Sequence, residues 1–363
     1  MLEKNVIRNQ KLYALQGLRA FAAAMVIFVH ALATFGSKVD STSLPTQFGG
    51  LGEMGVKLFF CISGFIIFTA SKNFIPGIQS AAIFLKRRII RVVPIYWLVT
   101  LVYATKLSLQ GVPPSFYELG LSLLFIPYMN QWDLMRPVLG VGWSLNFEMF
   151  FYFLVGLSIF LKKEVRVLFL FLVLAALIFF RWQGFIDHGM GFLGDVIYLL
   201  SDYYLIYFVG GLLIGVLRDF LKSNGISYSL QFTPALLISG GFLGVYLFLH
   251  ILGLIPSYMT EASMATVCMV CVLVSVFEFK PISHLTDGYV KRGLGLAGDA
   301  SYSTYLTHGF VMGPLARIIS YAEVPLSPLI FAFLMVPICT IFGIFVYKFL
   351  EKPLLTFMNK KYS

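Results

Sequence analysis

Two ionisable residues, Arg19 and His30, interrupt an otherwise apolar stretch, LRAFAAAMVIFVHA, at positions 18–31. On a helix their spacing is three turns plus about 20°, so both side chains lie on one stripe, about 16 Å apart along the axis. A histidine can act as a general base and an arginine can bind phosphate. The alternatives are a packing histidine and an arginine that snorkels to the headgroups. Two polar residues on one stripe favour a lined path.

The segment VGWSLNFEMFFYFL offers Glu148 as a partner for His30. If Trp143 marks the outer membrane interface, Glu148 lies about 8 Å below it, and His30 lies about 6 Å below the same surface. A carboxylate at that depth can pair with the imidazole, orient the ring and raise its basicity. We therefore predict a His30–Glu148 pair; the alternative is an isolated glutamate bonded to backbone or water.

The segment GEMGVKLFFCISGFIIF places Ser63 and Gly64 about 20 Å from the outer end of its span, near the depth of Arg19. Ser63 can supply a hydroxyl, and Gly64 allows a backbone or a narrow ligand to approach closely. Small residues at helix crossings also serve packing alone. A basic run at the cytoplasmic mouth follows, comprising Lys86, Arg87, Arg88 and Arg91. These cations can bind phosphates, although anionic lipid would satisfy them as well.

Two further regions place polar residues inside apolar segments. Asp195 and Asp202 are seven residues apart, so on one helix they share a face, and Tyr203 and Tyr204 follow them. That combination suits a polyhydroxylated ligand. The segment AGDASYSTYLTHGF contains Ser301, Tyr302, Ser303 and His308. His308 can serve the same cavity or tie helices together.

The elements that must position these residues are membrane-spanning helices. Hydrophobic residues make up 59% of the 363-residue chain, charged residues make up 12%, and the mean hydropathy is +0.86. A span needs about 20 apolar residues. The sequence predicts an all-α polytopic membrane protein with about ten such helices, at 12–34, 50–71, 90–106, 143–161, 165–181, 193–217, 231–253, 258–278, 295–319 and 326–349.

Basic residues predict that both termini are cytoplasmic. With ten spans, 20 of the 27 lysines and arginines fall in inner segments. The apolar run at 119–129 is too short to span, so we interpret it as re-entrant or interfacial within a long outer connection, 107–142. The predicted organisation is a cytoplasmic N-terminus (1–11), one membrane domain (12–353) and a basic cytoplasmic tail (354–363). The net charge of +10 therefore reports topology, and nucleic acid binding finds no support.

Two other interpretations carry less weight. Cys268 and Cys271 have a C-x-x-C spacing inside a span, but no second ligand pair is nearby, so we expect packing residues and no metal site. The N-terminal 33 residues could be a signal peptide, with a cleavage motif ending at Ala33. Arg19 would interrupt its hydrophobic region, and cleavage would break the alternation of loop charges, so we expect an uncleaved first span.

Taken together, these segments resemble the acyltransferase-3 family of integral membrane acyltransferases, which includes O-antigen and Nod-factor O-acetylases. The resemblance rests on six motifs in the family's order, spread over 15–353: Arg19 with ten residues before His30, FFCISG (59–64), RRIIR (87–91) with Pro94 and Tyr96, WSL (143–145) with Glu148, SYS (301–303) through His308, and EKP (351–353). Lys57 departs from a position that is often acidic or amide in the family. We expect no fused SGNH-type hydrolase domain.

The resemblance implies a bacterial inner-membrane O-acyltransferase that moves an acyl group, commonly acetyl from acetyl-CoA, to a hydroxyl of a cell-envelope carbohydrate or lipid-linked glycan such as lipopolysaccharide. It implies that His30 is the general base or a transient acyl carrier and that Glu148 is its partner or an acceptor ligand. The implied donor-binding residues are Arg19, Ser63, Gly64, Arg87, Arg88 and Arg91. We expect acceptor or cavity contacts at Trp143, Ser144, Asp195, Asp202, Tyr302 and His308. The alternatives are a transporter or flippase for a lipid-linked sugar, and a non-catalytic scaffold.

Overall fold

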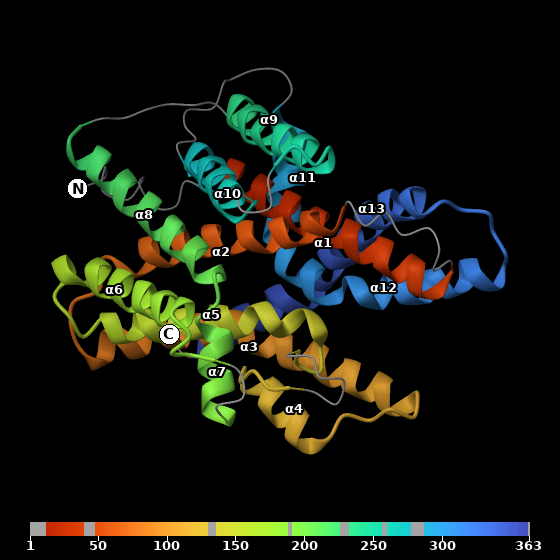
Figure 1. Ribbon diagram of the computed structural model, residues 1–363, viewed down its shortest axis with the longest axis horizontal. Helices are drawn as coiled ribbons and strands as arrows, with labels where there is room; N and C mark the ends of the chain where they lie inside the picture. Colours follow the sequence, from red (N-terminus) through yellow and green to blue (C-terminus); the bar gives the residue numbers. More distant parts are fainter. Residues whose placement is uncertain are drawn as a thin grey trace.

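The structure is a computed structural model that describes residues 12–39, 48–129, 136–187, 191–225, 232–255, 260–276 and 287–361. The described residues contain helices and connections but no strand. Fourteen α-helices follow the chain (Figure 1): α1 Tyr13–Lys38, α2 Gly49–Ser71, α3 Ile78–Leu109, α4 Phe116–Leu123, α5 Trp143–Ser158, α6 Lys163–Trp182, α7 Phe192–Leu200, α8 Tyr204–Ser223, α9 Phe232–Ile251, α10 Thr260–Val276, α11 Asp287–Asp299, α12 Ser301–Tyr321, α13 Pro328–Val346 and α14 Lys352–Lys361. A 3-10 turn, Gly140–Gly142, precedes α5, and a π-helix, Tyr347–Glu351, joins α13 to α14.

Seven helical segments of the described chain are long and apolar enough to cross a membrane. They are Tyr13–Lys38, Gly50–Ser71, Ile78–Leu109, Gly140–Ser158, Lys163–Trp182, Tyr204–Ser223 and Pro328–Lys360. The prediction of an all-α polytopic membrane protein is therefore confirmed. The count of ten spans and the cytoplasmic termini stay predictions, and the N-terminal segment 1–11 lies outside the described residues.

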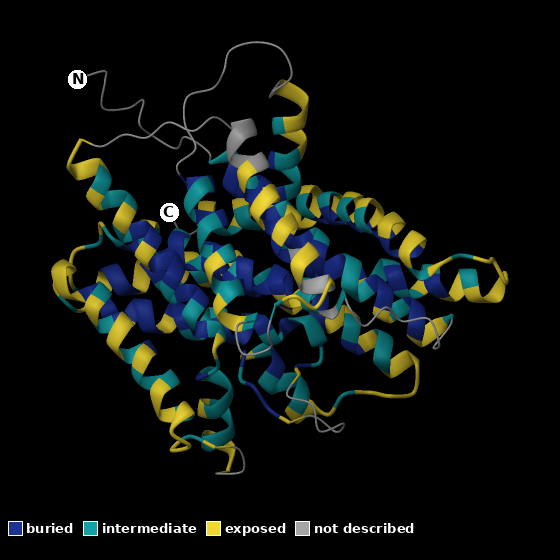
Figure 2. Cartoon of the chain, turned by 45° about the horizontal axis from the view of Figure 1, so that its top comes forward, coloured by how far each residue is buried: buried dark blue, intermediate teal, exposed yellow. Residues whose placement is uncertain are grey.

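Helices α1 and α2 form the centre of the molecule. Helix α1 packs along α2, α11, α12 and α13, and α2 packs against α8 and α10. Figure 2 shows the buried residues concentrated in these central helices, with exposed residues on the outer ones. Helices α2 and α8 approach each other through glycines: a Cβ at Gly64 would lie 2.2 Å from the backbone oxygen of Phe208, and one at Gly211 would lie 1.9 Å from that of Cys61. This close approach fixes the position of Ser63, the residue before Gly64.

Three of the predicted spans differ clearly from the observed helices, and one of them, 295–319, begins inside α11 and is interrupted at Ala300 before α12. Helix α3 begins at Ile78 rather than at residue 90, so the basic run at 86–91 lies inside the helix. The prediction took the basic run as the start of the helix. Charged side chains do not end a helix, and they indicate only the part of it that lies outside the lipid. The predicted span 193–217 is divided at residues 201–203 into α7 and α8. The hydroxyl of Ser201 donates to the carbonyl oxygen of Tyr198 (2.9 Å), a local bond that caps the end of α7.

The connection between α3 and α5 contains the short helix α4. Its eight residues span about 12 Å, which is less than the membrane core. The helix ends at a left-handed residue, Phe125 (φ 58°), and the amide of Ile126 donates to the carbonyl oxygen of Leu121 (3.0 Å), a common helix ending. Beyond it, the hydroxyls of Ser122 and Tyr128 are 3.1 Å apart, and burial raises the pKa of Tyr128. Two side chains of α3 hold the connection in place: the Tyr96 hydroxyl donates to the carbonyl oxygen of Ser122 (3.2 Å), and the Trp97 indole donates to that of Leu123 (2.8 Å).

Candidate active site

Five arginines line a wide pocket at the ends of α1, α2, α3 and α8, which we call the arginine pocket. Its volume is about 1130 Å³, and its cations are Arg19, Arg87, Arg88, Arg91 and Arg218. Two carboxylates, Asp299 and Glu351, also line it. The helix ends that meet here are the ones that the charge pattern places on the cytoplasmic side. The excess of positive charge suits a polyanionic ligand.

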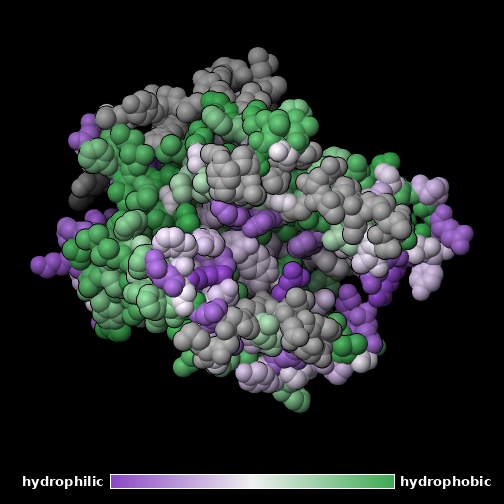
Figure 3. All heavy atoms as spheres, in the orientation of Figure 1, coloured by the Kyte–Doolittle hydropathy of each residue, from purple (hydrophilic) through white to green (hydrophobic). Residues whose placement is uncertain are grey.

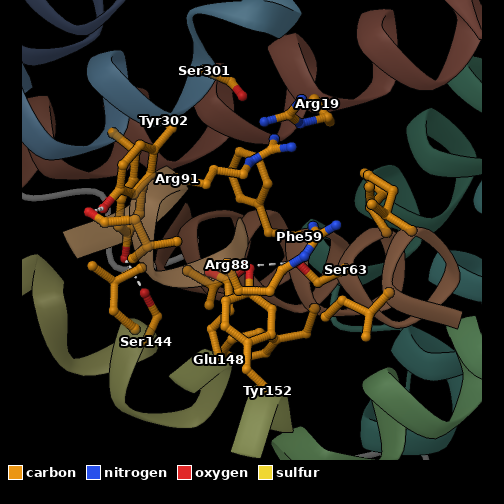
Figure 4. A pocket seen from close by; sticks show the side chains of 18 residues that line it. Arg19, Phe59, Ser63, Arg88, Arg91, Ser144, Glu148, Tyr152, Ser301 and Tyr302 are labelled. Atoms are coloured by element: carbon orange, nitrogen blue, oxygen red, sulfur yellow. Dashed lines mark hydrogen bonds between the residues drawn. The ribbon is translucent and has the colours of Figure 1, made fainter. Parts of the chain in front are cut away.

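A narrower space, the inner cavity, adjoins the arginine pocket. Its volume is about 80 Å³ (Figure 4). The two spaces share Arg19, Ile66, Arg88 and Arg91, so these side chains lie at the boundary between them. Its other polar lining residues are Ser63, Ser144, Glu148, Tyr152, Ser301, Tyr302 and Tyr305. The side chain of Arg19 is only 8% exposed and lines both spaces, so it faces this site rather than lipid.

Glu148 holds two hydroxyl groups at the wall of the inner cavity. Its Oε1 accepts hydrogen bonds from the Ser63 hydroxyl (3.2 Å) and from the Tyr152 hydroxyl. Arg88 stacks on the same tyrosine, with its guanidinium carbon 6.0 Å from the ring centre. Figure 4 shows Arg88, Ser63 and Glu148 around one side of the cavity. The carboxylate thus belongs to the group of residues that line the space next to the arginines.

His30 pairs with a second histidine rather than with Glu148. The Nδ1 atom of His30 lies 2.7 Å from the Nε2 atom of His308, and the two rings stack with centres 5.0 Å apart. The predicted His30–Glu148 pair is therefore wrong. Helix α1 packs on α2, α12 and α13, whereas α5 packs on α2 and α3. The depth arithmetic also failed here, because it placed Glu148 about 8 Å and Ser63 about 20 Å below the outer surface. In the structure these two side chains are bonded to each other.

Tyr305 connects the inner cavity with the histidine pair. It lines the cavity, and its ring centre lies 6.2 Å from that of His308, one turn further along α12. Its hydroxyl is 2.9 Å from the Ser144 hydroxyl and donates to the carbonyl oxygen of Val141 (2.9 Å). The ring is thus fixed to the start of α5, between the cavity and the histidines.

Several predicted site residues lie elsewhere. Gly64 packs against the backbone of α8 and does not line the described cavities, so its predicted donor contact is wrong. Trp143 packs in an aromatic cluster, with its ring centre 5.0 Å from that of Tyr204. Asp202 pairs with Arg181 (3.0 Å). Asp195 and Asp202 were predicted to share a face of one continuous helix. That prediction is wrong, because the chain leaves the helix at 201–203.

The structure adds residues to which the sequence assigned no role at the site. Tyr152 lies four residues after Glu148, a spacing that brings side chains together on a helix and could have indicated it. Glu351, in the EKP motif, is turned into the arginine pocket by the π-helix, where the Ser303 hydroxyl donates to it. π-Helical turns frequently occur at functional sites.

The unusual Lys57 is neutralised locally. Its ammonium group is buried and pairs with Glu53 (2.8 Å) and with Glu261 (2.7 Å), and the Tyr207 hydroxyl donates to Glu261. This cluster joins α2, α8 and α10. It explains why a lysine is buried at this position, so no role in the inner cavity is needed to explain it. Among the described residues no group of histidines, cysteines and carboxylates could hold a metal ion.

Comparisons with known proteins agree with this geometry. The family described as "Acyltransferase domain" matches residues 12–348. The chain is also similar to the exopolysaccharide production protein ExoZ of Rhizobium meliloti (strain 1021), with 31% identity over 326 residues, which cover 84% of this chain and 90% of that protein. No solved structure matches the chain.

Proposed function

The chain belongs to the acyltransferase family and is a multi-pass membrane acyltransferase, and on that premise we propose that it transfers a short acyl group from a cytoplasmic acyl-CoA to a hydroxyl of a cell-envelope carbohydrate. Acetyl-CoA is the proposed donor, and the bacterial inner membrane is the proposed location. The observation that carries the donor assignment is that the arginine pocket adjoins the inner cavity at Arg19, Arg88 and Arg91, which line both spaces.

A coenzyme A thioester fits these two spaces in one orientation. Its nucleotide and diphosphate need a wide cationic site, and Arg87, Arg88, Arg91 and Arg218 supply charge-assisted hydrogen bonds there. Its extended arm then runs past Arg19 into the inner cavity. In this arrangement Glu148 is a positioning residue that accepts an amide N–H of the arm, while Ser63 and Tyr152 hold its carboxylate.

His30 is the proposed general base, and His308 orients it. General-base action requires that His30 donates from Nδ1 to Nε2 of His308, which then carries its own proton on Nδ1. Nε2 of His30 keeps its lone pair and takes the proton of the acceptor hydroxyl. The hydroxyl oxygen bonds to the acyl carbon, the bond from that carbon to the coenzyme A sulfur breaks, and the sulfur leaves with the proton returned by His30.

The proposed acceptor is a carbohydrate, free or linked to lipid. The similarity to a protein named for exopolysaccharide production supports this class. Trp143 and Tyr204, whose ring centres are 5.0 Å apart, lie at the N-terminal ends of α5 and α8, which the charge pattern places on the outer side. Aromatic rings in such a position suit the apolar faces of sugars.

The test is transfer from radiolabelled acetyl-CoA by purified protein in lipid nanodiscs, with bacterial surface oligosaccharides as acceptors. We expect label in the saccharide, and a loss of at least about 10²-fold for His30→Ala, because general-base catalysis contributes that much. Ser37→Ala, a substitution of an exposed residue further along α1, is the matched control and should leave transfer unchanged. Transfer by the His30 variant at the wild-type rate would contradict the proposed base, and failure to bind or consume any acyl-CoA would contradict the donor.

A further inference from the structure

A third pocket lies away from the proposed donor site, between α2, α5, α6 and α8, and we call it the lateral groove. Its volume is about 440 Å³. Its apolar lining includes Phe68, Phe151, Val155, Leu170, Leu212 and Val216. Helix α6 is at the edge of the molecule (Figure 1), and α6 exposes large apolar residues such as Leu168, Phe171 and Leu172. In Figure 3 hydrophobic residues cover this side, over α6 and α8, so this face suits contact with lipid.

Charged residues gather at one end of the lateral groove. Lys72, Lys163, Arg166 and Asp219 line it, which leaves an excess of two positive charges. Lys72 and Asp219 neutralise each other, with the ammonium nitrogen 2.6 Å from the carboxylate. The excess therefore belongs to Lys163 and Arg166, three residues apart on the first turns of α6.

Neither of these two cations forms an ion pair with a carboxylate of the described chain, and Glu164, on the first turn of α6, acts on Arg166 only at longer range. The guanidinium of Arg166 donates only to carbonyl oxygens, those of Leu161 (3.1 Å), Ile159 (3.3 Å) and Ser71 (3.4 Å). Arg166 is 5% exposed, so its charge is held in place at the end of the groove. Lys163 is exposed beside it and has no hydrogen bond or ion pair to any described residue.

We propose that the lateral groove binds an anionic phospholipid, with its phosphate at Lys163 and Arg166 and an acyl chain along the apolar wall. Basic pockets between membrane helices on the cytoplasmic side are suited to anionic headgroups. The apolar wall suits a hydrocarbon occupant, and the two cations, which form no ion pair within the described chain, suit an anion. A lipid provides both in one molecule, whereas a soluble phosphate would satisfy the cations alone. The proposal does not depend on the acyl-transfer reaction.

Lipid binding can be measured on the full chain by native mass spectrometry. Purified protein is titrated with phosphatidylglycerol and, separately, with phosphatidylcholine carrying the same acyl chains. We expect tighter binding of the first phosphatidylglycerol molecule, and a loss of about five-fold in that affinity for Lys163→Gln, because each basic residue near a lipid surface contributes about that factor. Lys162→Gln is the matched control: it removes an adjacent exposed lysine that does not line the groove, and it should have no effect.

A second variant tests the hydrocarbon part of the site. Val216→Phe fills the half-buried apolar wall, so we expect weaker binding of the first molecule of both lipids, and excess glycerol phosphate should not displace bound phosphatidylglycerol. Equal binding of the two lipids by the wild type, or equal behaviour of Lys163→Gln and Lys162→Gln, would overturn the headgroup assignment. Displacement by glycerol phosphate would show a phosphate site rather than a lipid site, and would also overturn the proposal.

Discussion

The Nδ1 atom of His30 on α1 and the Nε2 atom of His308 on α12 lie 2.7 Å apart, so a hydrogen bond joins two helices inside the membrane. Such a bond needs one N–H donor and one acceptor nitrogen, and therefore at least one of the rings is neutral. His308 is only 3% exposed, so its own position is fixed by packing. The bond to this fixed ring holds the ring of His30 in one orientation. His308 acts in the proposed mechanism through His30, as a positioning residue.

Replacing His308 separates orientation from packing. His308→Gln keeps an acceptor oxygen for the Nδ1–H of His30, whereas His308→Leu keeps only a similar volume. We expect the leucine variant to lose about ten-fold to 10²-fold in kcat, up to the low end of general-base contributions, and the glutamine variant to recover part of that loss. Transfer kinetics at saturating acetyl-CoA provide the measurement. Equal rates for both variants would indicate that His308 only fills space.

Several residues that the sequence singled out line the inner cavity, among them Arg19, Ser63, Arg88, Glu148 and Tyr302. The roles assigned to them stay predictions. Hydropathy and helical periodicity give the depth and the face of a side chain, because both follow from the rise and the turn of a helix. Those quantities cannot tell which neighbouring helix a face meets.

That missing information contributes to the errors at the site, where Glu148 faces Ser63 on α2 and His30 faces α12. The depth assignment failed as well, because Ser63 and Glu148 were placed about 12 Å apart in depth. The interruption after α7 falls on Ser201, Asp202 and Tyr203, polar residues of which we interpreted the last two as ligand contacts on a continuous helix rather than as the end of a helix. Tertiary packing decides both features, and a single sequence does not encode it in a pattern that can be read locally.

The corrected position of Glu148 predicts how two substitutions combine. The free-energy effects of substitutions at two distant residues without a shared partner usually add to within about 0.5 kcal/mol. The effects at two residues joined by a hydrogen bond do not add. We expect the double variant of Glu148→Gln and His308→Gln to lose a rate factor equal to the product of the two single losses. The double variant of His30→Asn and His308→Gln should lose much less than the product of its two single losses. A double-mutant cycle on kcat/KM measures both pairs in one experiment. Strong coupling between Glu148 and His308 would favour a direct link between carboxylate and histidines.

The arginine pocket predicts a selective effect on donor affinity. Arg88 and Arg91 line both spaces, and hydrogen bonds to charged groups contribute about 1.5–3 kcal/mol each. We therefore expect Arg88→Gln and Arg91→Gln to weaken coenzyme A binding at least about ten-fold, with a larger effect on KM than on kcat. Lys86→Gln is the matched control, because Lys86 is an exposed residue of the same helix that lines neither space.

Calorimetric titration with coenzyme A measures this effect without relying on turnover. The affinity of the wild type should fall with added salt, because the proposed contacts are ionic. Retention of wild-type affinity by both arginine variants would move the nucleotide out of the arginine pocket. A loss in the Lys86 variant as large as in the arginine variants would indicate a general effect of surface charge.

Tyr305 predicts a test of how the acyl group meets the base. Its ring lines the inner cavity on one side and lies beside His308 on the other, and its hydroxyl is tied to Ser144 and to the carbonyl oxygen of Val141. Tyr305→Phe removes both bonds but keeps the ring, whereas Tyr305→Ala opens the cavity towards the histidines. If the ring keeps water from the thioester, Tyr305→Ala should release coenzyme A by hydrolysis when no acceptor is present, several-fold faster than the wild type and Tyr305→Phe. A thiol assay of coenzyme A release measures this directly, and equal release by all three proteins would exclude a shielding role for the ring.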